Sequence, residues 1–200
     1  TFAIRNAKQN NCITCHMPKN GSIDIPHVAV TDHFIRKRPL LQNSQEVTKF
    51  ISMICYSNDQ PDARTRARAF LEFYERYEPA KLFLDSALNY LSKSGVDIQH
   101  DADNDLIRIY FLQEKYAELV ALVKSKKEND FTDAWTCYRI GESYLKLGNT
   151  SDAISYLQHS VTLKKYALDF QNKLGNAFLL AKKSEEAKKV FMFIVNENPR

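Results

Sequence analysis

The sequence predicts an all-α protein in which a loop-rich N-terminal segment is followed by a solenoid of helix pairs. Two observations predict this fold. Proline, glycine and histidine are concentrated in residues 1–41, and a 34-residue repeat runs through the C-terminal third of the chain. Because the composition changes where this segment ends, we expect two regions, 1–41 and 42–200.

The composition excludes some classes of function. Of the 200 residues, 44% are hydrophobic and 26% are charged, as in ordinary globular proteins. No stretch approaches the roughly 20 apolar residues that a membrane-spanning helix needs. The net charge of +4 is spread along the chain without a basic cluster, which gives no basis for nucleic-acid binding.

The first region has few features of regular structure. Pro18, Pro26, Pro39 and Gly21 prevent long helices, so we expect mostly loop, with at most a short helix that ends near His16. The segment has little apolar material of its own. A large buried cofactor would organise it.

From about Gln45 onward the apolar spacing is helical almost throughout. We expect a helix pair over residues 62–91 and a longer linker over residues 92–103. In this pair the second helix should carry Tyr77, Ala80, Leu84 and Ala87. A weaker pair follows, and its apolar positions are Leu106, Ile107, Tyr110, Tyr116, Leu119 and Val123.

The run from residue 133 to residue 200 repeats itself. Five apolar or small residues recur 34 positions later, in the pairs Ile140 and Leu174, Gly141 and Gly175, Tyr144 and Phe178, Ala153 and Ala187, and Leu157 and Phe191. A period of about 34 residues is typical of tetratricopeptide repeats, which are antiparallel helix pairs. The small residues should lie where the two helices cross, and Gly148 should end the first helix in a left-handed conformation. In all we expect about four helix pairs.

Several residues that could suggest a site are better explained by packing. The repeat aromatics Tyr110, Tyr144, Phe178 and Phe191 should fill the core. Cys55 and Cys137 fall in apolar helical patterns and should be buried. His100 and His159 are each alone, so we expect ordinary surface or core residues.

The segment Cys12-Ile13-Thr14-Cys15-His16 has the Cys-x-x-Cys-His spacing that attaches c-type haem. Two thiols three positions apart reach the two vinyl groups of one porphyrin, and the following histidine ligates the iron. A zinc site that combines this motif with His27 and His33 remains an alternative. A thioredoxin-like site is disfavoured, because no strand precedes the motif.

Residues 12–35 as a whole resemble the final haem module of multihaem c-type cytochromes, in which Cys-x-x-Cys-His-Met-Pro is followed by a histidine and then by Thr-Asp-His. Some members of that family continue into tetratricopeptide repeats. The resemblance implies that His16 is the proximal ligand and that His27 and His33 are distal ligands of this haem or of a neighbouring one. It also implies further haems upstream and a periplasmic, extracellular or cell-surface location in a bacterium.

We therefore expect electron transfer through at least one haem c, with the repeats as a docking scaffold. The expected partners are an upstream multihaem domain, other cytochromes, and a protein on the repeat surface; the chain could also form oligomers. One alternative is part of a multihaem oxidoreductase that acts on a small nitrogen or sulfur compound. Another is a zinc-binding repeat scaffold. An electron carrier fits the motif better than a catalyst does.

Overall fold

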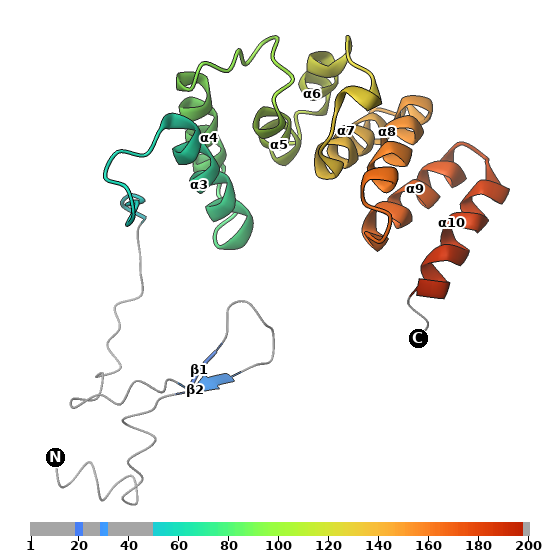
Figure 1. The fold of residues 1–200 in the computed structure, drawn as a ribbon, viewed down its shortest axis with the longest axis horizontal. Coiled ribbons are helices and arrows are strands. Elements are labelled where there is room, and N and C mark those ends of the chain that lie inside the picture. The colour runs from blue at the N-terminus through green and yellow to red at the C-terminus, as the bar shows by residue number, and fades with distance from the viewer. Residues whose placement is uncertain (1–18, 22–28, 32–49, 198–200) are drawn as a thin grey trace, which may run out of the picture. The chain divides into compact units, whose positions relative to one another are not determined.

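A computed structural model of the chain describes residues 19–21, 29–31 and 50–197. The chain divides into two compact units, Thr1–Ser52 and Met53–Arg200 (Figure 1). The boundary expected after residue 41 lies outside the described residues and stays a prediction.

The described part of the first unit is a pair of short strands. β1 (Lys19–Gly21) and β2 (Ala29–Thr31) are antiparallel, and Lys19 pairs with Thr31 while Gly21 pairs with Ala29. The sequence did not predict them, because each strand has only three residues and Lys-Asn-Gly has low strand propensity.

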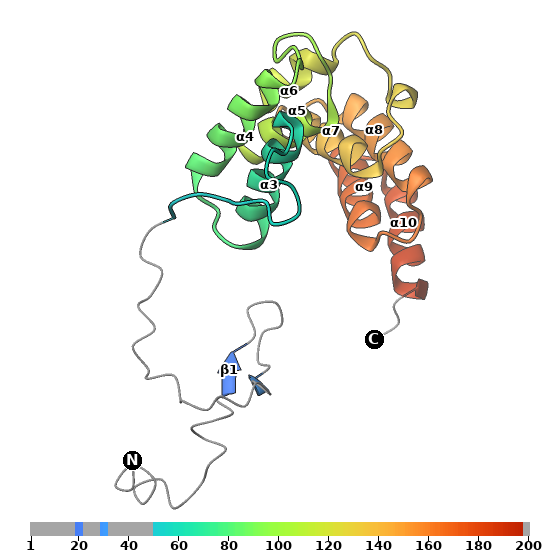
Figure 2. The same cartoon turned by 60° about the vertical axis from the view of Figure 1, so that its left-hand side comes forward.

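The second unit is a curved array of eight α-helices among the described residues (Figures 1 and 2). Consecutive helices pack as pairs, and each pair contacts the next. The helices are α3 (Ala63–Arg76) with α4 (Lys81–Lys93), α5 (Asn104–Leu112) with α6 (Tyr116–Val123), α7 (Ala134–Lys146) with α8 (Thr150–Leu163), and α9 (Leu168–Leu180) with α10 (Ser184–Glu197). A 3₁₀ turn, Glu128–Asp130, precedes α7. The predicted solenoid of about four helix pairs is confirmed.

Aspartate side chains define the start of three first helices. Asp62, Asp103 and Asp133 each accept a hydrogen bond from a backbone N–H of the first turn, which would otherwise have no partner. At the other end of α7, Gly148 has a φ of +79°, the left-handed conformation that the sequence predicts.

Two details in and before the first pair differ from the prediction. Tyr77 and Ala80 are not on the second helix, since they cap the end of α3 and the start of α4. Pro79 explains this, because a proline disfavours helical backbone in the residue before it.

Residues 50–62 are also irregular rather than helical, so Cys55 is only partly buried and is not a core residue.

The core consists of two clusters. The larger one extends from Ala67 to Tyr156, and the smaller one joins α8, α9 and α10. Cys137, Tyr144 and Phe178 are buried as expected, whereas Tyr110 and Phe191 are partly buried against the clusters.

Candidate functional site

The predicted haem or zinc residues Cys12, Cys15, His16, His27 and His33 lie outside the described residues. Their roles therefore stay predictions. Within the described ranges no three His, Cys, Asp or Glu residues are grouped so as to hold a metal ion. Of the two remaining histidines, His100 is exposed and pairs with Asp97, and Nε2 of His159 lies 2.9 Å from the carbonyl oxygen of Phe131.

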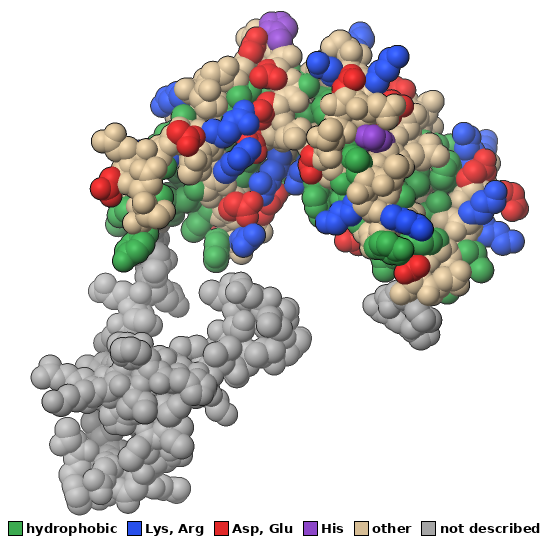
Figure 3. All heavy atoms as spheres, viewed as in Figure 1, with side chains coloured by type: hydrophobic (Ala, Val, Ile, Leu, Met, Phe, Trp, Pro, Cys, Tyr) green, Lys and Arg blue, Asp and Glu red, His purple; other side chains and the backbone are tan. Residues whose placement is uncertain are grey.

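Among the described residues, one groove combines many charged side chains with an exposed tryptophan. It has a volume of about 650 Å³ and lies on the first helices of three successive pairs. We call it the inner groove. It is lined from α3 by Arg68, Glu72, Glu75 and Arg76, from α5 by Asn104, Asp105 and Arg108, and from α7 and its cap by Asp133, Trp135, Thr136 and Arg139. Figure 3 shows basic and acidic side chains next to one another where α3 and α5 meet.

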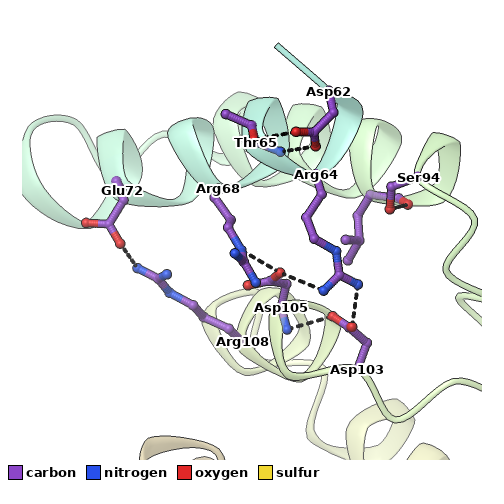
Figure 4. Close-up of polar contacts among 10 residues, drawn as sticks. Asp62, Arg64, Thr65, Arg68, Glu72, Ser94, Asp103, Asp105 and Arg108 are labelled. Atoms are coloured by element: carbon purple, nitrogen blue, oxygen red, sulfur yellow. Dashed lines mark hydrogen bonds and ion pairs between the residues drawn. The ribbon is translucent and has the colours of Figure 1, made fainter.

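Ion pairs connect α3 to α5 across the groove (Figure 4). Nε of Arg68 donates to Oδ2 of Asp105 at 2.8 Å, and Arg64 donates to Asp103 at 2.5 Å. In the opposite direction Arg108 of α5 donates to Glu72 at 2.8 Å and also to Glu75. The two helices are thus joined by contacts that span 33 to 39 residues of sequence.

Asp105 is the most buried carboxylate of this network. It is only 7% exposed, and a buried charge is tolerated when it is paired. Arg68 and Arg64 supply the pairing, with nitrogen atoms 2.8 and 3.7 Å from Oδ2.

The ion pairs also change proton affinities. The hydrogen bond from Arg108 lowers the pKa of Glu72, although burial opposes this effect. Burial alone would lower the pKa of Arg108, but its bonds to Glu75 and Glu72 outweigh burial and raise it. Both groups therefore keep their charges over the physiological pH range.

Arg139 of α7 differs from these arginines. Within residues 50–197 its guanidinium makes no ion pair or hydrogen bond, and it lies over the ring of Trp135, 5.6 Å from the centroid. Burial, with a contribution from nearby Arg108, lowers the pKa of Arg139. Asp133 acts on this charge only through space: its Oδ2 accepts bonds from the backbone and hydroxyl of Thr136, and among the described residues it forms no ion pair with Arg139.

Trp135 forms the apolar part of the groove. Its side chain is 44% exposed, although its ring is held edge-on against Phe170 at 4.7 Å and against Tyr138 at 5.7 Å. A large aromatic surface that is both fixed and exposed is characteristic of binding sites.

Sequence reasoning did not identify the inner groove. One available signal was the recurrence of an arginine five or six residues after each capping aspartate, as in Asp62 and Arg68, Asp103 and Arg108, and Asp133 and Arg139. Positions spaced in this way lie near the start of each first helix, and stacked first helices bring them together.

The comparisons with known proteins concern the repeats. The tetratricopeptide repeat model matches residues 136–166, so the predicted repeat is present there. No curated protein matches the sequence. A solved structure titled MamA AMB-1 is 16% identical, with a TM-score of 0.49, over 66% of this chain and 70% of that chain. None of the described helices is long and apolar enough to cross a membrane.

Proposed function

We propose that the chain is an electron-transfer protein in which the repeat array docks a partner protein in its inner groove. The observation that carries the docking function is the groove itself, an open volume of about 650 Å³ built by the first helices of three consecutive pairs. A solenoid presents such an extended surface because its repeats stack side by side.

The electron-transfer part rests on the sequence of the N-terminal segment. Cys12 and Cys15 would hold a haem c through thioether bonds, and His16 would ligate its iron. Two thiols and an adjacent imidazole are the donor set that this attachment needs. A haem held in this way supplies reversible one-electron exchange.

His27 and His33 are the proposed distal ligands. Each of them would ligate the iron of this haem or of a neighbouring one. Upstream haems, other cytochromes as partners, and a periplasmic, extracellular or cell-surface location are parts of the same proposal.

An optical spectrum tests the haem. The chain is produced with a haem-attachment system, and the oxidised and reduced spectra are followed by a pyridine haemochrome assay. We expect a c-type spectrum that survives acid–acetone extraction and is lost in a Cys12→Ala, Cys15→Ala variant. Absence of haem from the unaltered chain would contradict the proposal, and stoichiometric zinc would favour the zinc-binding scaffold instead.

The spin state separates a carrier from a catalyst. A six-coordinate low-spin iron that loses this state in a His33→Ala or His27→Ala variant supports electron transfer. A five-coordinate high-spin iron in the unaltered chain would favour the oxidoreductase alternative, because catalysis on a small nitrogen or sulfur compound needs an open position on the iron.

A peptide selection tests the docking function. Random dodecapeptides displayed on phage are selected on the full chain, and the enriched peptides are synthesised and titrated by calorimetry. Because the groove spans three helices, we expect one family of peptides with micromolar dissociation constants. Failure to enrich any peptide over a surface without protein would contradict docking by the groove.

A further inference from the structure

A row of basic residues runs along the four first helices. Arg68, Arg139 and Lys173 are each the sixth residue of their helices, α3, α7 and α9, and Arg108 is the fifth residue of α5. Equivalent positions on stacked helices lie next to one another. These residues therefore form a basic row that crosses the array from one pair to the next.

Three members of the row have a carboxylate partner on a neighbouring first helix. Arg68 donates to Asp105, Arg108 donates to Glu72 and Glu75, and Nζ of Lys173 donates to Glu142 at 2.8 Å. Only Arg139, among the row's members, has no such partner. The carboxylates of Glu75, Asp133 and Asp105 affect it only through space.

The helix positions account for the missing partner. Glu142, the carboxylate that pairs with Lys173, is the ninth residue of α7, whereas the ninth residue of α5 is the apolar Leu112. Arg108 lines the same groove as Arg139, has the same charge, and helps to lower the pKa of Arg139. Two guanidinium groups therefore lie near each other at the junction of α5 and α7, and the carboxylates bonded to Arg108 both come from α3.

The charge balance of the groove indicates what it would accept. Its lining has four arginines and four carboxylates, and the carboxylates of Glu72, Glu75 and Asp105 are paired with arginines while Asp133 caps α7. A nucleic acid or polyphosphate would therefore meet several negative charges. A ligand with a single carboxylate suits the one arginine that lacks a partner.

We infer that the inner groove binds an acidic segment of a partner protein, in which one Asp or Glu side chain pairs with Arg139 beside Arg108 and a neighbouring apolar side chain packs on Trp135. This inference rests on the proposed docking function and names the partner's chemistry. The carboxylate supplies the missing ion pair, and the exposed, fixed ring of Trp135 supplies apolar contact area next to it.

The peptides enriched on the full chain provide the test. We expect them to share an acidic residue next to an aromatic or aliphatic one. Replacing that acidic residue by its amide should weaken binding to the unaltered chain about tenfold, which corresponds to about 1.4 kcal/mol. This peptide substitution needs no change in the protein, so it is independent of folding.

Matched protein variants locate the contact. Arg139→Gln should weaken the acidic peptide about tenfold and leave its amide analogue unchanged. Arg76→Gln removes the same charge from the same groove, but at an exposed side chain that pairs with Glu72, and should change binding by less than about twofold. Thermal melting by circular dichroism verifies that both variants are folded.

The outcomes separate the two proposals. Peptides that bind equally well to the unaltered chain and to Arg139→Gln, or that carry no acidic residue, would overturn this inference and leave docking intact. Equal losses in both arginine variants would indicate nonspecific attraction and would also overturn it. If no peptide is enriched, both the docking function and the inference fail.

Discussion

A Cβ atom added at Gly141 would lie 2.7 Å from Cγ of Leu157, and 3.2 Å from the carbonyl oxygen of Ala153. α7 and α8 therefore cross at a distance that leaves no room for a side chain. Leu157 is fully buried and cannot swing away. The 34-residue spacing of glycine and alanine in the sequence reflects this contact between backbones.

Gly141→Ala should lower the free energy of unfolding by about 1–2 kcal/mol. Overpacking costs about 1–3 kcal/mol, and the better helix propensity of alanine returns at most about 1 kcal/mol. Urea denaturation followed by circular dichroism measures the difference.

Gly175→Ala is the matched control at the repeat-equivalent position. Its Cβ would meet the ring of Phe191 at 2.6 Å, but this ring is only partly buried and can move. We expect a loss smaller than that of Gly141→Ala. A larger loss at Gly175 would contradict this account of the two crossings.

Asp105→Asn should destabilise the array by about 1–3 kcal/mol, because it leaves Arg68 without its carboxylate on α5 and removes the weaker of the two carboxylate contacts of Arg64, which keeps Asp103. The estimate is below that of a fully buried pair, since both arginine side chains are more than one third exposed. Urea midpoints measure it. The exposed Arg76–Glu72 pair within α3 offers the comparison, and Arg76→Gln should cost less than about 0.5 kcal/mol.

Acid should weaken the connection between α3 and α5. The folded-state pKa of Glu72 is lowered, first by the hydrogen bond from Arg108, so its contribution to stability is present above the unfolded pKa of about 4.3. That contribution is lost as the pH falls through the lower folded-state value. Urea midpoints measured from about pH 6 to about pH 3 should fall less steeply in Glu72→Gln, and an unchanged slope would contradict this role.

The two solitary cysteines should differ in reactivity. Burial, with a contribution from Asp133, raises the pKa of Cys137 to about 12, whereas the hydrogen bond with Ser57 lowers the pKa of Cys55. In a chain with Cys12 and Cys15 replaced by alanine, a thiol-specific disulfide reagent near pH 8 should modify Cys55 rapidly. Cys137 should react only on unfolding.

The control for this prediction is Cys55→Ser in the same background, which should show no rapid phase. A rapid phase that persists would mean that Cys137 is accessible in the folded array. Above about pH 9 the folded protein should also lose stability, because the unfolded thiol of Cys137 ionises before the folded one.

The helix pairs could be predicted because their signals are local. The matches of Gly141 with Gly175 and of Tyr144 with Phe178 identify the repeat from residue types alone, and the buried face of each helix follows from its spacing. The same reasoning failed at residues 50–62 and at Tyr77, where Pro61 and Pro79 disfavour helical backbone in the residues before them.

The inner groove could not be predicted in this way. Its character depends on which polar residues meet across helices, such as Arg68 and Asp105, which are 37 positions apart. Helical periodicity distinguishes an inner face from an outer one, but it does not pair charges between helices. The haem residues, from Cys12 to His33, were predicted from a short motif. The optical spectrum described above tests that prediction.

The two hydrophobic clusters meet in α8, where Tyr156 belongs to the larger cluster and Ile154 and Leu157 belong to the smaller one. In a repeat array the cooperativity of folding passes from each unit to the next through their shared interface. α8 is therefore the helix through which the folding of the last helix pair is coupled to the folding of the first three pairs. Destabilising substitutions in α8 should make the two ends of the array unfold in separate transitions. Destabilising substitutions in α10 should leave the remaining helices unfolding in one cooperative transition.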